Sequence, residues 1–204
     1  MAQVFQYKCE FCGTDLENHW LSQHICQKCK KPQHFHLPDY FQIFGLEVRF
    51  QLNQDELRER FYQLAQLLHP DRFPRFDAQA LEKMSFINRA YEVLKNSEKR
   101  RNYILQQENL SIEKSHLPLE LAEEWFTLQE KIHTSQVNAF SQICQFENQL
   151  ESQETQLEAQ IDQLEQKFDE MHQRDDLVLL AQMVQKKKSL TSLMQDLKQV
   201  KHHV

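Results

Sequence analysis

Apolar residues in the middle of this 204-residue chain recur at helical spacings on both sides of a short polar segment. The apolar positions before it are Leu57, Phe61, Leu64 and Leu68, and those after it are Leu81, Met84, Ile87, Tyr91 and Leu94. Both sets follow the three- and four-residue spacing of an amphipathic helix. Because proline disfavours helical geometry in the residue before it, Pro70 predicts that the first helix ends at Leu68 or His69. The pattern therefore predicts two helices packed as an antiparallel hairpin, with an exposed loop between them.

Helical periodicity returns in the last third of the chain. One heptad-like seam consists of Ile143, Phe146, Leu150, Leu157, Ile161, Leu164, Phe168 and Met171, and a second set of Leu177, Leu180, Val184, Leu190, Leu193 and Leu197. Residues 173–176 predict a turn followed by the start of a helix, and Pro118 is well placed as the first residue of an earlier helix. We predict an antiparallel three-helix bundle. The same seam would also suit a coiled coil with a second copy of the chain, so a homodimer stays open.

Composition agrees with helix nearly throughout, since the chain has only two glycines and is rich in Gln, Glu, Leu and Lys. The predicted fold class is therefore all-α. The net charge of −6 carries no basic signature for nucleic acid. The longest apolar run in the last third, Leu177–Ala181, is far too short to cross a membrane. The N-terminal residues lack a secretory or transit pattern. We expect a cytoplasmic bacterial protein, or a mitochondrial matrix form without its presequence.

Two cysteine pairs stand near the N-terminus, Cys9 with Cys12 and Cys26 with Cys29, each with two residues between its members. Two such pairs close together suit a tetrahedral thiolate site. About thirty residues cannot bury much of a core, so a bound metal would supply the folding energy. We predict structural Zn²⁺; a redox dithiol pair and a rubredoxin-like iron site are the alternatives. Four thiolates leave no open position for a catalytic zinc.

The surroundings of these pairs differ from each other. Gly13 eases the turn after the first pair, whereas Lys30 in the matching place gives no such help. Four histidines lie nearby in the sequence: His19, His24, His34 and His36. Because four cysteines already complete a tetrahedral set, we expect these histidines to lie in solvent or to support the ligands by hydrogen bonds.

A short unit precedes the hairpin. Residues 39–46 predict a short first helix that closes at Gly45. Its apolar residues, which are expected to pack onto the hairpin, are Tyr40, Phe41, Phe44 and Leu46. Asn53, followed three residues later by Glu56, is a candidate N-terminal cap for the first hairpin helix.

The loop of the hairpin contains the tripeptide His69-Pro70-Asp71. With an amphipathic helix on each side, and with Ile87–Leu94 leading into Ser97–Tyr103, this segment resembles a J domain, the module that stimulates the ATPase of DnaK-type chaperones. The resemblance implies that Asp71 meets an arginine of the ATPase in a charge-assisted hydrogen bond. It also implies that His69 and Pro70 fix the loop. Positive charge that would steer an acidic partner comes from Arg58 and Arg72, with Arg60 and Arg75.

Further residues narrow the resemblance. Asp39-Tyr40-Phe41, Gly45-Leu46, Arg49-Phe50 and Phe73 are similar to the HscB family, the J-type co-chaperones of iron–sulfur cluster assembly. Some members of that family carry an N-terminal tetracysteine knuckle. The resemblance implies a knuckle and linker at residues 1–37, a J domain at 38–107 and a C-terminal helical bundle at 108–204. It also implies two partners, an HscA-like DnaK-type chaperone and an IscU-like iron–sulfur scaffold protein.

The helix after Pro118 carries bulky apolar and acidic groups on several faces. In HscB-like proteins this helix contributes to binding the scaffold, and Trp125, Phe126 and Glu130 best match that pattern here. Cys144, within the next helix, is interpreted as a packed thiol. No glycine-rich phosphate loop is present, so we expect a co-chaperone and not an enzyme. The alternatives are a general J-domain adaptor for another client and a zinc-dependent nucleic-acid or redox protein with a coiled-coil arm.

Overall fold

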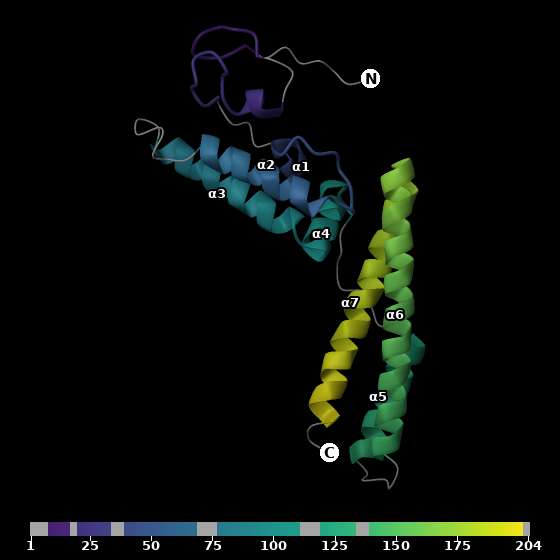
Figure 1. Cartoon of the computed structure of the whole chain (residues 1–204). Helices are drawn as coiled ribbons and strands as arrows, with labels where there is room; N and C mark the ends of the chain where they lie inside the picture. Colours follow the sequence, from purple (N-terminus) through teal and green to yellow (C-terminus); the bar gives the residue numbers. More distant parts are fainter. Residues whose placement is uncertain are drawn as a thin grey trace. The chain divides into compact units, whose positions relative to one another are not determined.

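The computed structural model describes residues 8–16, 20–33, 39–68, 77–110, 119–133 and 139–201, and these residues form two compact units, Met1–Tyr103 and Ile104–Val204 (Figure 1). The elements are η1 (Trp20–Gln23), α1 (Tyr40–Ile43), α2 (Gln54–Leu67), α3 (Asp77–Leu94), α4 (Ser97–Gln107), α5 (Leu119–His133), α6 (Ala139–Met171) and α7 (Arg174–Lys201). Within the described ranges, extended pairing is limited to two isolated β-bridges. The predicted all-α fold class is confirmed. The finer division into three parts stays a prediction.

The helices α2 and α3 form the predicted hairpin and lie side by side (Figure 1). Helix α2 ends at Leu67, and the Leu68 amide closes its last turn by donating to the Leu64 carbonyl at 2.9 Å. The residues buried along the hairpin are Leu57, Leu64, Leu68, Ile87, Ala90 and Leu94. Across the two helices, the rings of Phe61 and Tyr91 stack with centroids 4.3 Å apart. The predicted end of the first hairpin helix is confirmed.

The short helix α1 is fixed by caps at both ends. Asp39 Oδ1 accepts from the Phe41 amide at 2.7 Å, and Gly45 adopts the left-handed φ of +62° that closes a helix without a Cβ penalty. The Tyr103 hydroxyl accepts from the Tyr40 amide at 2.9 Å, and the two tyrosine rings stack. Of the predicted packing residues, Phe41 and Phe44 are fully buried, whereas Tyr40 and Leu46 are half-buried.

The start of α2 also follows the prediction. The Asn53 side chain accepts from the amides of Asp55 and Glu56 at 3.0 and 3.2 Å. An N-cap of this kind satisfies amides that have no partner within the helix, and it contributes about 1 kcal/mol.

Helix α4 was not predicted as a separate element. Arg100, in the first turn of α4, is only 6% exposed, although arginine is rarely buried. The guanidinium donates to the Phe50 carbonyl at 2.7 Å and to the Leu94 carbonyl at the end of α3. Arg100 therefore joins the loop before α2 to the end of α3.

The second unit contains the long hairpin of α6 and α7, with the shorter α5 packed against α6 (Figure 1). The predicted three-helix bundle is confirmed. Its buried seam includes Ile143, Phe146, Leu150, Leu157, Ile161, Phe168, Leu177, Leu180, Val184, Leu190, Leu193 and Leu197. Among the helices described, none is long and apolar enough to cross a membrane.

The connection between α6 and α7 lies where the sequence predicts it. A turn and a helix start were predicted at residues 173–176, and α6 ends at Met171 while α7 begins at Arg174. His172 takes a φ of +54° to reverse the chain within two residues. Asp176 lies in the first turn of α7, where its buried carboxylate pairs with Lys167 at 2.6 Å.

Candidate metal centre and binding surfaces

The two cysteine pairs sit on turns that repeat the same backbone hydrogen bonds. In the first turn, the Gly13 amide donates to the Cys9 carbonyl at 2.8 Å, and the Cys9 amide donates to the Thr14 carbonyl at 2.9 Å. In the second turn, the Lys30 amide donates to the Cys26 carbonyl at 2.9 Å, and the Cys26 amide donates to the Lys31 carbonyl at 3.0 Å. An isolated antiparallel bridge closes each turn. The two turns are therefore copies of one local structure.

The repeat extends to the backbone torsions. Gly13 has a φ of +67°, and Lys30 has a φ of +57°. A left-handed conformation costs a residue with a Cβ about 1–2 kcal/mol, and glycine avoids this cost. Lys30 therefore adopts the glycine conformation at a cost that the rest of the knuckle must offset.

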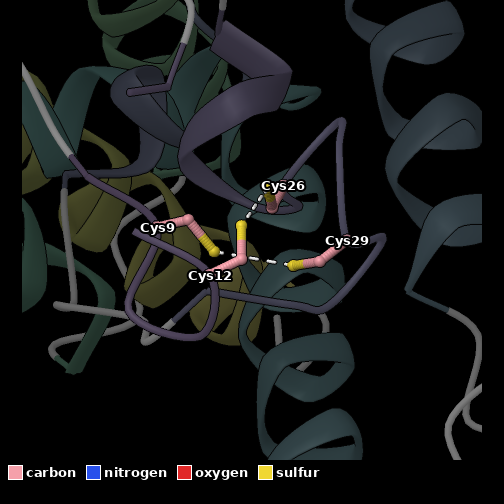
Figure 2. A group of neighbouring side chains, drawn as sticks. All are labelled: Cys9, Cys12, Cys26 and Cys29. Atoms are coloured by element: carbon pink, nitrogen blue, oxygen red, sulfur yellow. Dashed lines mark hydrogen bonds between the residues drawn. The ribbon is translucent and has the colours of Figure 1, made fainter. Parts of the chain in front are cut away.

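The four cysteine sulfurs converge from the two turns (Figure 2), and all lie within 4.8 Å of one another. The separation of Cys9 Sγ from Cys29 Sγ is 3.6 Å, and that of Cys12 Sγ from Cys26 Sγ is 3.8 Å. A tetrahedral Zn–thiolate centre with bonds of about 2.3 Å has sulfur–sulfur edges of roughly 3.8 Å. The four thiolates thus have the composition and spacing of a structural metal site.

The surroundings of Cys9 and Cys12 favour the thiolate form that a metal needs, whereas burial and the neighbouring cysteines raise the pKa of Cys29 to about 11. The Thr14 hydroxyl lies 3.4 Å from Cys12 Sγ and lowers the pKa of Cys12 to about 6. Burial raises the pKa of Cys9, but hydrogen bonds from the backbone amides of Phe11 and Cys12 outweigh it and lower the pKa overall. Gln33 donates from Nε2 to Cys9 Sγ at 3.4 Å, so the ligand is held from outside the metal centre.

The structure corrects the expectation for His24. This residue does not lie in solvent: it is 2% exposed, and its Nε2 is 2.9 Å from the Ile43 carbonyl of α1. Burial lowers the pKa of His24 to about 4. The imidazole is therefore neutral at physiological pH and serves as a buried contact to α1. His19, His34 and His36 lie outside the described residues.

The predicted chaperone-binding residues His69, Pro70, Asp71 and Arg72 lie outside the described residues. Arg58, the fifth of that set, is exposed on α2, and its guanidinium pairs with Asp55 at 2.5 Å. The roles of these five residues stay predictions.

The predicted scaffold-binding residues take different positions on α5. Trp125 is only 8% exposed, and its ring lies parallel to that of Phe146 with centroids 6.3 Å apart. Phe126 is 67% exposed, and Glu130 is exposed one turn further along. A groove of about 340 Å³ runs beside Trp125 towards α7. Phe126 and Glu130 are thus exposed on α5, whereas Trp125 is largely buried.

The hydrophobic pattern of the sequence does not predict the burial of several polar residues, namely His24, Gln33, Lys83, Arg100 and Arg101. Lys83 and Arg100 stand within amphipathic segments at positions that a helical pattern leaves to solvent. No local signal in the sequence identifies their partners, since Gln33 and Phe50 are fifty residues away.

Residues 39–103 match the DnaJ domain family. This span contains α1, α2, α3 and the first part of α4. These residues of the chain therefore have the sequence pattern of a J domain. Curated co-chaperones of the HscB family confirm the resemblance over the aligned residues, and two solved HscB structures show a similar fold.

The co-chaperone protein HscB homolog of Colwellia psychrerythraea is 36% identical over 78 residues, which cover 36% of this chain and 45% of the relative. The chain thus spans about half the length of this curated relative. Human co-chaperone protein HscB has a similar structure, with a TM-score of 0.63 and 18% identity over 97% of this chain and all of the human chain (100%). Chaperone HscB from Vibrio cholerae gives a TM-score of 0.50 and 22% identity, covering 81% of this chain and 99% of that chain.

Proposed function

We propose that the protein is a J-type co-chaperone of iron–sulfur cluster assembly. It stimulates the ATPase of an HscA-like DnaK-type chaperone and delivers an IscU-like scaffold protein to it. The observation that carries the proposal is the DnaJ match over residues 39–103, in which a helical hairpin flanks His69-Pro70-Asp71. The chain supplies contacts and no catalytic groups of its own, because hydrolysis takes place on the partner. The bacterial cytoplasm is the expected compartment.

The contact with the chaperone involves α2 and the tripeptide. Asp71 accepts a charge-assisted hydrogen bond from an arginine of the ATPase, which fixes the orientation of the docked J domain. Arg58 and Arg72 add positive charge that speeds the encounter with an acidic surface. Arg58 is already exposed on α2, and its partner Asp55 is itself exposed, so the pair can open at little cost.

The scaffold binds on α5. Phe126 supplies exposed apolar surface, and Glu130 an acidic group next to it. Trp125 supports this surface from the bundle core through its contact with Phe146. A general adaptor would use the same surface for a different client.

The knuckle holds Zn²⁺ through Cys9, Cys12, Cys26 and Cys29. The sulfur separations and the thiolate-favouring surroundings of Cys9 and Cys12 support this assignment. The metal would cross-link two turns that have little core of their own. Metal analysis of the purified protein, together with thiol titration, distinguishes zinc from iron and from a cycling dithiol.

Asp71→Asn provides the test, measured as ATP turnover by the cognate chaperone with the scaffold present. We expect this variant to lose most of the stimulation. Asp162→Asn, a change of the same kind at an exposed position of α6, should stimulate as the wild type does. Full stimulation by Asp71→Asn would show that the tripeptide has no such role. If the chaperone responds but full-length Phe126→Ala binds the scaffold as tightly as wild type, the proposed scaffold surface is wrong.

A further inference from the structure

The cysteine knuckle packs against the J domain, because residues at the end of its 3₁₀ helix η1 and just after it form hydrogen bonds to α1. His24 Nε2 lies 2.9 Å from the Ile43 carbonyl, and Gln23 Nε2 donates to the Gln42 carbonyl at 2.9 Å. Helix α1 has only four residues, which is too few to be stable alone. It therefore depends on what packs around it, and the knuckle is part of that packing.

Arg60 forms a second connection. From α2, its Nη1 donates to the carbonyls of Phe44 and Gly45 at 2.5 and 2.7 Å, and Nη2 pairs with Glu56. The guanidinium also lies over the Trp20 ring of η1, 5.3 Å from its centroid. Trp20 approaches Gly45 so closely that a Cβ there would stand 2.4 Å from the Trp20 Cβ. The knuckle, the loop after α1 and the middle of α2 thus meet around one arginine.

Gln33 and Lys83 form a third connection, which starts at a cysteine. Gln33 donates to Cys9 Sγ at 3.4 Å, and its own carbonyl accepts from Lys83 Nζ of α3. Its side-chain oxygen also accepts from the Glu10 amide at 3.3 Å. Gln33 and Lys83 are 5% and 6% exposed. A buried ammonium is costly without a partner, so the position of Gln33 matters to α3.

We propose that the tetracysteine site is a metal-dependent brace of the J domain, in which metal occupancy stabilises α1 and the middle of α3 through Gln33, His24 and Trp20. This inference rests on the proposed metal binding. A ligand that binds only the folded knuckle also stabilises every segment whose folding is coupled to the knuckle. Without metal, the two turns lose their cross-link, and the contacts of Lys83 with Gln33, of Arg60 with Trp20 and of α1 with His24 and Gln23 are weakened.

The proposed brace would stabilise the part of the protein that binds the chaperone. Helices α2 and α3 flank His69-Pro70-Asp71 in the sequence, and Arg60 and Lys83 lie on these helices. Metal loading would therefore set how much of the J domain is in its folded form, and so how much is competent to dock.

Hydrogen–deuterium exchange on the full-length protein, zinc-loaded and zinc-free under reducing conditions, tests the proposal. Zinc should slow exchange of the amides of α1 and of residues 82–90 by at least about tenfold. Exchange in α6 and α7 should not change and is the internal reference. In Lys83→Met, the zinc effect on residues 82–90 should fall below about threefold, whereas Lys95→Met, at an exposed lysine one residue beyond α3, should keep it.

The outcomes separate this inference from the proposals it rests on. Zinc that binds without slowing exchange in α1 and α3 overturns the brace and leaves the zinc site standing. Failure to bind zinc, seen by metal analysis, overturns both, while stimulation of the chaperone ATPase reports on the co-chaperone role alone. If Lys83→Met does not fold, Trp20→Leu removes the Arg60 contact instead. An undiminished zinc effect on α1 in that variant would also contradict the brace.

Discussion

Replacing Gly45 by alanine should destabilise the first unit by about 2–5 kcal/mol through two effects. The φ of +62° at Gly45 costs a residue with a Cβ about 1–2 kcal/mol. The new Cβ would also stand 2.4 Å from the Trp20 Cβ and 2.8 Å from its Cγ, distances that real contacts essentially never show. Trp20 must therefore move, and overpacking of this kind costs about 1–3 kcal/mol. The displaced indole would also leave the Arg60 guanidinium.

Gly13→Ala is the matched control for this substitution. Gly13 has almost the same φ, +67°, but no atom lies within 4 Å of the position of its Cβ. Gly13→Ala should therefore show the backbone cost alone, about 1–2 kcal/mol. The difference between the two variants measures the contact between Gly45 and Trp20.

Urea denaturation with saturating zinc measures this difference. The chain has two tryptophans, so a Trp125→Phe background leaves Trp20 as the only indole and reports unfolding of the first unit. Gly45→Ala should lose more unfolding free energy than Gly13→Ala by at least about 1 kcal/mol. Equal losses would show that Trp20 does not pack against Gly45, and one of the three connections between the knuckle and the J domain would be absent.

Three further predictions concern single side chains. Lys30→Gly should stabilise the zinc-loaded knuckle by about 1 kcal/mol in the same urea assay, because glycine adopts the φ of +57° without strain; an unchanged or lower stability would contradict this reasoning. An NMR titration of His24 in the zinc-loaded protein should give a midpoint near 4, and a midpoint near 6.5 would show that the ring is not buried. Because that pKa is depressed in the folded state, protonation of His24 favours the unfolded chain. The free energy of unfolding should therefore be roughly 3 kcal/mol higher above pH 6.5 than below pH 4, and it should fall between these two pH values. Trp125→Ala should cost about 3–5 kcal/mol of bundle stability, whereas Phe126→Ala should stay within about 0.5 kcal/mol and weaken scaffold binding; the opposite ranking in calorimetry would reverse their assignments as core and surface residues.

The features that the sequence predicted correctly are those that neighbouring residues decide. The Asn53 cap, the closure at Gly45 and the end of α2 near Leu68 each depend on residues within one helical turn. The cysteine pairs also depend on neighbouring residues alone, because the two-residue spacing within each pair corresponds to one tight turn. Their convergence in space could be predicted because a metal needs four ligands, which is a chemical constraint and not a folding one.

The features that were missed depend on contacts between distant segments. The sequence pattern predicts Lys83 as a solvent-facing residue of α3, but in the structure it is buried and donates to the Gln33 carbonyl of the knuckle. His24 was assigned to the surroundings of the cysteines because of its sequence position, whereas its partner is the Ile43 carbonyl. A helical pattern distinguishes apolar from polar faces, but it does not show which polar residues a neighbouring module will bury.

The exposure of the four cysteines bears on how fast a bound metal would be exchanged. Cys9 and Cys26 are buried, but Cys12 is exposed and Cys29 is half-exposed, so each turn has one cysteine that solvent can reach. A chelator or a competing thiol can approach those two sulfurs without any prior unfolding. Release of a bound metal would then depend on the concentration of the attacking ligand and not on the unfolding rate, so a metal with a structural role would still exchange quickly.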